Sequence, residues 1–202
     1  MMRTGLHGVP MAPRTCFGTV SRRRALAWLG ALPVGAATVA VEAAPAVPGE
    51  VPAELPGARL RGQGRLTFFG LSVYDARLWV DDSFRTDAAI DRPLALELVY
   101  ARKLHGHAIA DRSLAEMRRA SPMGAADAER WLAAMRATFA DVSPGDRMTG
   151  VHRPGTGARF FLNGDPRGEI SDAAFARAFF AIWLGPATSE PALRQALLGL
   201  GA

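Results

Sequence analysis

The chain has 202 residues, of which 49% are hydrophobic and 21% are charged, the composition of an ordinary globular protein. Its formal charge of +5 is concentrated at the start of the chain, because five arginines and one glutamate lie in residues 1–46. Without that segment 19 basic and 18 acidic residues remain, a net charge of +1, which argues against a nucleic-acid-binding protein.

The first 46 residues have the pattern of an export leader. The basic cluster Arg22–Arg24 precedes an apolar run over residues 25–41, and the small residues Ala44–Ala46 then offer a cleavage site. The run is interrupted by glycine and proline and is shorter than the about 20 residues of a membrane-spanning helix. Ser21–Arg23 resembles the twin-arginine export motif. We therefore predict a leader over residues 1–46 that the export machinery recognises, and a periplasmic or secreted mature protein; the alternative is an uncleaved N-terminal anchor.

The segment after the leader is predicted to be a linker. Cys16, the single cysteine, lies within the leader, so the rest of the chain has no thiol for a disulfide, a thiolate metal site or a cysteine nucleophile. Residues 47–57 contain three prolines among small and polar residues, a composition typical of an extended linker. The folded domain is expected to occupy residues 58–202.

Strand-forming residues dominate two stretches of this domain, residues 65–80 and 94–100. Both are rich in branched and aromatic side chains, which fill a pleated surface. Gly70 predicts a bend or a bulge within the first stretch. Two further short strands are expected around the glycine-rich segment 154–158, and Asn163–Gly164 is typical of a tight hairpin turn.

Four helices are predicted between and after these strands. Apolar residues recur at helical spacing over residues 109–117 and 128–139. A third helix is expected to start at residues 171–172, which can cap it, and to end at Gly185, and a fourth begins near Ser189. The order is strands, two helices, strands, two helices. This order predicts an α+β domain rather than a parallel sheet with alternating helices.

Motifs that carry catalysis or metal binding are missing from the sequence. Neither a P-loop, a dinucleotide-binding fingerprint nor a G-x-S-x-G motif is present. His105 and His107 are spaced like a metal-binding pair, but a metal site needs three or four convergent ligands, and His152 could join them only through the fold. We therefore predict that these two histidines lie in a solvated loop, and we predict no metal site and no cofactor.

Several stretches together resemble the bacterial chalcone isomerase-like family. They are GQGRLTFFGLSVYDARLWV, LELVYARKLHGHAIADRSLAEMRR, SPGDRMTG, FFLNGDPRGEI and FARAFFAIWLGPATSEPALRQALLG. The resemblance runs from about Arg61 to Gly199. It implies the chalcone isomerase fold, an antiparallel β-sheet packed against a layer of α-helices in an open-faced β-sandwich.

The resemblance does not imply chalcone isomerase activity. The plant isomerases cyclise a chalcone with an arginine, a threonine, a tyrosine, a lysine and an asparagine. Alignment of their motif with IADRSLAE places Ile109 at the tyrosine, Arg112 at the lysine and Glu116 at the asparagine, and the strand threonine becomes Phe69. Loss of the hydroxyl donors removes stabilisation from the developing enolate. We therefore expect no catalytic residues; an active isomerase or lyase would have to use Tyr74, Arg112 and Glu116.

Other members of the fold bind fatty acids through an arginine and a tyrosine, and this resemblance implies a ligand. Arg65 and Tyr74 are the nearest candidates, although they lie at opposite strand parity unless a bulge at Gly70 realigns them. The other predicted ligand-binding residues are Arg112, Phe69 and Phe180. The leading hypothesis is a non-catalytic protein that binds a fatty acid or another small apolar carboxylate, and the alternatives are an isomerase and a structural or partner-binding domain without a ligand.

Overall fold

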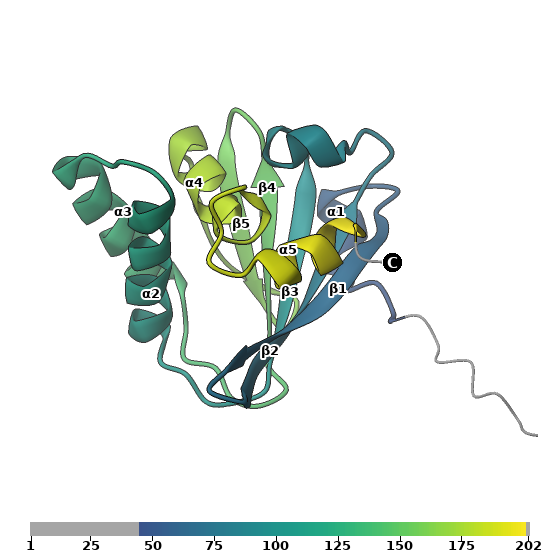
Figure 1. Cartoon of the computed structure of the whole chain (residues 1–202), viewed down its shortest axis with the longest axis horizontal. Helices are drawn as coiled ribbons and strands as arrows, with labels where there is room; N and C mark the ends of the chain where they lie inside the picture. The colour runs from purple at the N-terminus through teal and green to yellow at the C-terminus, as the bar shows by residue number, and fades with distance from the viewer. Residues whose placement is uncertain (1–44, 201–202) are drawn as a thin grey trace, which may run out of the picture. The chain divides into compact units, whose positions relative to one another are not determined.

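A six-stranded antiparallel sheet, with its strands in chain order, forms the centre of the computed structural model (Figure 1). The structure describes residues 45–200. The strands are β1 (Arg59–Phe68), β2 (Leu71–Val80), β3 (Leu94–Tyr100), β4 (Arg147–Arg153), β5 (Gly157–Leu162) and β6 (Asp165–Ile170). The helices are α1 (Glu50–Glu54), the 3-10 helix η1 (Thr86–Asp91), α2 (Gly106–Ala120), α3 (Ala125–Thr138), α4 (Ala173–Leu184) and α5 (Pro191–Leu198). The predicted α+β class with helices on an antiparallel sheet is confirmed.

The predicted leader lies outside the described residues except for its last two positions. Export, its cleavage and the location of the mature protein therefore stay predictions. Among residues 45–200, none of the helices has the length and hydropathy of a membrane-spanning segment.

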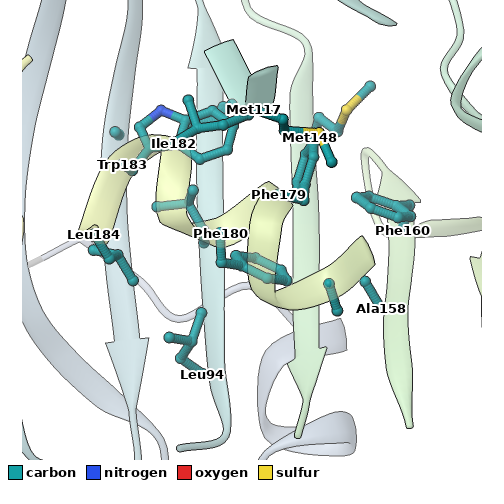
Figure 2. Close-up of a cluster of buried hydrophobic side chains, with 14 of the residues drawn as sticks. Leu94, Met117, Met148, Ala158, Phe160, Phe179, Phe180, Ile182, Trp183 and Leu184 are labelled. Atoms are coloured by element: carbon teal, nitrogen blue, oxygen red, sulfur yellow. The ribbon is translucent and has the colours of Figure 1, made fainter. Parts of the chain in front are cut away.

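The main core lies between one face of the sheet and the helices α2 to α5. Side chains of one parity on each strand face these helices, as period-two alternation requires. Figure 2 shows α4 lying over the strands, and Phe179 and Phe180 point from it to different parts of the sheet. The Phe179 ring centroid lies 5.3 Å from that of Phe160. The apolar residues of α4 are therefore first of all core residues.

The opposite face of the sheet is covered in part by α1, within the segment that the sequence predicts as an extended linker. Val51 is fully buried there with Trp79 and Phe161. Glu50 accepts a hydrogen bond of 2.7 Å from the Thr149 hydroxyl. Pro52 is compatible with the helix because a first-turn residue needs no N–H partner. Residues 50–54 therefore belong to the folded unit.

The predicted bend at Gly70 is a complete chain reversal. Residues 69–70 form a two-residue turn between the paired residues Phe68 and Leu71, so that residues 65–80 contain parts of two strands. The first of these strands begins at Arg59. Gly62 within it is required by α5, because a Cβ atom there would lie 2.2 Å from the Ala196 carbonyl oxygen.

The second half of the chain follows the predicted order with one addition. The Asp172 carboxylate caps α4 by accepting a hydrogen bond of 2.9 Å from the Phe175 N–H, as predicted. Asn163–Gly164 is the predicted hairpin turn, and it leads into β6, which the sequence did not predict. The strand β6 is exposed up to Ile170 and contains Pro166, features of an edge strand with little apolar patterning.

Candidate functional site

A cavity of about 380 Å³ lies between the helical layer and the sheet, at the end of the sheet that carries the β1–β2 hairpin. Its lining comes from β1 to β4, from α2 and α4, and from the segment between α4 and α5. Apolar side chains dominate the lining, among them Leu98, Ile109, Phe139, Met148, Phe179 and Ile182. Its volume falls within the range of about 300–1,000 Å³ that is common for small-molecule sites.

Tyr74 on β2 supplies a hydroxyl group to this cavity. Trp183 Nε1 on α4 donates a hydrogen bond of 2.9 Å to that hydroxyl. Burial raises the pKa of Tyr74 to about 12, so the group is neutral at physiological pH. Tyr100, which faces Tyr74 on β3, packs edge-to-face against it at 5.9 Å, and burial raises the pKa of Tyr100 as well. Because Trp183 uses an acceptor position of the Tyr74 hydroxyl, the hydroxyl proton can be donated to a ligand.

Glu116 on α2 is a buried carboxylate at the cavity wall. Its oxygens lie 2.6 Å from Arg112 Nη2 and 2.8 Å from Arg119 Nε. Burial alone would raise the pKa of Glu116, but hydrogen bonds from Arg119 and Ser189 and the two guanidinium charges outweigh burial and lower the pKa. Arg119 also donates a hydrogen bond of 2.7 Å to the Ala187 carbonyl oxygen. Glu116 therefore stays charged and joins α2 to the segment after α4.

Two arginines bring positive charge to the exposed edge of the cavity. Arg112 is paired with Glu116, and its side chain is 68% exposed. Arg102 follows β3, lines the same cavity and is also exposed. Unlike Arg112, Arg102 forms no ion pair with any carboxylate of residues 45–200. The site therefore combines an apolar interior with two arginines and one exposed carboxylate, Glu190, at its edge.

Comparison with known proteins identifies the family of this fold. The model of the chalcone isomerase-like family matches residues 45–199. The chain belongs to the chalcone isomerase-like family. This result confirms the predicted resemblance, and the match includes the segment predicted as a linker.

Two further comparisons found a similar sequence and a similar solved structure. An uncharacterized protein of Haemophilus influenzae is 34% identical over 138 residues, which are 68% of this chain and 66% of the relative. The match thus spans about two thirds of the relative's length. The crystal structure of the fatty-acid binding protein AtFAP1 of Arabidopsis thaliana matches with a TM-score of 0.57 and 15% identity, over 71% of this chain and 87% of AtFAP1. At this identity the match shows a shared fold.

The candidate residues of this chalcone isomerase-like chain divide between the cavity and other places. Tyr74, Arg112 and Glu116 all line the cavity. Arg65 does not: its Nε and Nη2 atoms lie 2.6 Å and 2.9 Å from the two carboxylate oxygens of Asp75. Arg65 pairs with Asp75 across the β1–β2 ladder, whereas Leu66 pairs with Tyr74. The two irregularities in the ladder, at Leu60/Gly62 and at Leu66/Thr67, lie on either side of these pairs and leave Arg65 and Tyr74 on opposite faces of the sheet.

The two phenylalanines predicted as ligand-binding residues also lie outside the cavity. Phe69 is 90% exposed in the hairpin turn, because the chain reverses there instead of bending. Phe180 is fully buried against Gly150 and His152, and its ring centroid lies 4.9 Å from that of His152. Its neighbour Phe179 lines the cavity instead, because Phe179 and Trp183 are four residues apart and lie on the same face of α4.

Sequence reasoning missed Tyr100 and Arg102 as cavity residues. Tyr100 has the same parity as Leu94, Leu96 and Leu98 on β3, and this pattern could have placed it beside the helices. Nothing in the local sequence marks Arg102, because its position depends on how β3 leads into α2.

The two histidines predicted to lie in a loop flank the start of α2. His105 precedes the helix, with Nδ1 at 3.0 Å from Asp141 Oδ2, and His107 lies in the first turn. Within residues 45–200, no group of three or more His, Cys, Asp or Glu side chains is placed to hold a metal ion.

Proposed function

We propose that this chalcone isomerase-like protein is exported and binds a fatty acid or another small apolar carboxylate in the cavity without transforming it. The observation that carries this proposal is the apolar cavity with Arg102 and Arg112 at its exposed edge. Burial of an alkyl chain contributes about 0.8 kcal/mol per CH₂ group. A carboxylate that leaves water needs a paired cation, which an arginine provides with two parallel hydrogen bonds. The fold shared with a fatty-acid binding protein supports the same ligand class.

The charges in the site suggest the orientation of the ligand. Arg112 is already engaged by Glu116, whereas Arg102 has no ion pair among residues 45–200. We therefore place the ligand carboxylate near Arg102, with Arg112 as a second cation and the Tyr74 hydroxyl as a donor. The alkyl chain then runs among Phe139 and Phe179 on the apolar side.

The same geometry argues against catalysis of chalcone cyclisation. At the positions that align with the plant hydroxyl groups, Phe69 is in the hairpin turn and Ile109 is an apolar part of the wall. Glu116 is a weak base, because its carboxylate is held by Arg112 and Arg119. We expect no flavanone formation above the buffer rate with saturating protein. Turnover that is lost in Arg112→Ala would favour the isomerase alternative instead.

Isothermal titration with decanoate tests the binding proposal. Arg102→Gln should weaken decanoate binding by roughly 10- to 100-fold, because a charge-assisted hydrogen bond contributes about 1.5–3 kcal/mol. Decanol, which has no carboxylate, should bind wild type and Arg102→Gln equally. The matched control is Arg65→Gln, since Arg65 is an exposed arginine that faces Asp75 and not the cavity. If the wild-type protein binds no carboxylic acid, the proposal fails and the domain without a ligand takes its place.

Export needs a separate measurement. The mass of the protein recovered from the periplasm should correspond to a chain that begins near Val47. An intact leader on a cytoplasmic product would contradict the export part of the proposal.

A further inference from the structure

Large apolar side chains lie exposed together at the tip of the β1–β2 hairpin. Phe69 is 90% exposed, Leu71 59% and Phe68 58%. We call these three residues the hairpin patch. Among residues 45–200, the other exposed large apolar side chains are Val47 and Leu200, near the two ends of that range. The patch is thus a local concentration of apolar surface, a feature that marks interaction sites. In Figure 1 the hairpin reaches the lower end of the sheet.

The geometry of the turn does not explain why a phenylalanine lies at its tip. Phe69 and Gly70 have φ angles of 48° and 76°, and Asn163 and Gly164 in the β5–β6 turn have φ angles of 55° and 96°. Both are two-residue hairpin loops in which both residues have positive φ. Asparagine suits the first position, whereas a bulky side chain there is strained. Phe69 is therefore both strained and exposed to water, although the same chain uses asparagine in an equivalent turn.

Two cations lie beside the hairpin patch. The N–H of Ala101 donates a hydrogen bond of 2.9 Å to the Val73 carbonyl oxygen, which places Arg102 and Lys103 directly after this contact with the hairpin. Arg102 also shares the cavity lining with Phe68. Neither Arg102 nor Lys103 forms an ion pair with a carboxylate of residues 45–200.

Of the acidic groups near these cations, Asp75 and Asp141 are already engaged, whereas the exposed Glu190 lines the same cavity as Arg102. Asp75 is bound by Arg65 on the other face of the hairpin. Asp141 accepts a hydrogen bond of 2.9 Å from the Gly106 N–H and pairs with His105. These two contacts, and to a smaller extent the charge of Lys103, lower the pKa of Asp141. Arg102 and Lys103 outnumber Glu190, so the surface around the hairpin patch still offers net positive charge to a partner.

We propose that the hairpin patch docks this protein on a membrane surface rich in anionic phospholipid. Phe69 and Leu71 enter the region between headgroups and acyl chains, where aromatic and aliphatic side chains are favoured, and Arg102 and Lys103 meet the phosphate groups. An apolar tip flanked by cations matches a membrane surface, where anionic headgroups cover acyl chains, better than it matches a partner whose surface is apolar throughout. Phe68 belongs both to the hairpin patch and to the cavity wall, so docking would bring the cavity next to a source of apolar acids. Only this connection between membrane docking and the supply of apolar acids to the cavity rests on the proposed function.

A fluorescent reporter at the hairpin tests docking directly in the full chain. In a Cys16→Ser background, Thr67→Cys carries an environment-sensitive dye, and Thr156→Cys carries the same dye in the β4–β5 turn at the opposite end of the sheet. Both threonines are exposed. With phosphatidylglycerol vesicles, and no fatty acid present, the dye at position 67 should shift to the blue and gain intensity, while the dye at position 156 should not change.

Variants of the hairpin separate docking from folding. Phe69→Asn gives this turn the residue of the β5–β6 turn, so it should leave the melting temperature unchanged or raise it while it lowers vesicle affinity at least tenfold. Val47→Ser, which removes an exposed apolar side chain elsewhere, should leave the affinity unchanged. Arg102→Gln with Lys103→Gln should weaken binding to phosphatidylglycerol and not to phosphatidylcholine.

Three results would overturn the docking proposal. They are a dye at position 67 that stays water-like in the presence of vesicles, an equal response at position 156, and a response that depends on protein concentration without vesicles. The last result would point to a second copy of the chain as the partner. None of these outcomes depends on whether decanoate binds in solution, so docking and the proposed function can fail separately.

Discussion

Tyr74 and Tyr100 are the two tyrosines of the chain, and both are buried at the candidate site. Burial raises the pKa of Tyr74 from its ordinary value of 10.0 to about 12 and raises the pKa of Tyr100 as well. The folded state thus holds these protons more tightly than the unfolded state. Their contribution to the free energy of unfolding is complete below pH 10, and the part that belongs to Tyr74 is lost as the pH rises from 10 through about 12.

A spectrophotometric titration tests this environment. The folded protein should show no tyrosinate absorbance at pH 10, and in urea both tyrosines should titrate near pH 10. Tyr74→Phe should remove one tyrosinate and cost about 1 kcal/mol at pH 7, because Trp183 Nε1 loses its acceptor. Half-ionisation of either tyrosine at pH 10 in the folded protein would show that the site is open to water.

At the residue scale, the alternation of side chains along the strands correctly predicted the faces of the sheet on which Arg65 and Tyr74 lie. It predicted Arg65 and Tyr74 on opposite faces of the sheet. The ladder keeps them there, because the pairs Arg65–Asp75 and Leu66–Tyr74 lie next to each other with no irregularity between them. The sequence could not predict that Arg102 lines the cavity, because this position depends on the path of the chain from β3 into α2, which is set by tertiary packing.

At the scale of elements, α1 differs most from what its composition predicted, because the proline-rich segment predicted as a linker contains a helix that packs on the sheet. Its buried contacts come from Val51, and ion pairs join Glu54 to Arg153 and Arg159 on β4 and β5. The two ion pairs join residues 99 and 105 positions apart, and local patterning cannot predict such contacts. By contrast, α4 was predictable because its cap and its apolar spacing are local.

Two valines provide a matched test of α1. Val51 is fully buried, whereas Val47, four residues earlier, is 42% exposed. Val51→Ala should lower the free energy of unfolding by about 2 kcal/mol, because two carbon equivalents leave the core and a small cavity remains. Val47→Ala should change it by less than about 0.5 kcal/mol. Urea denaturation measures both, and equal values would show that α1 does not contribute to the stability of the sheet.

At the scale of the whole molecule, the cavity and the core are two parts of one helix–sheet interface. Phe179 and Trp183 on α4 both belong to the core and line the cavity, whereas Phe180 on the same helix serves the core alone. The sequence predicted that α4 packs on the sheet, but the empty volume depends on the depth at which α2 and α4 sit over the strands. Side chains that no local pattern connects, such as Leu66, Ile109 and Met148, therefore meet at its wall.

Ligand binding should consequently stabilise the whole domain. A ligand that binds the folded state alone adds RT ln(1 + [L]/Kd), about 2.7 kcal/mol at one hundred times Kd. For a domain of this size that corresponds to a rise in melting temperature of roughly 5–10 °C. Decanoate should produce this rise in wild type and in Arg65→Gln. Ile109→Trp, which places a larger side chain in the cavity wall, should fold and show no rise. An equal decanoate-dependent rise in Ile109→Trp would mean that the acid binds elsewhere on the surface.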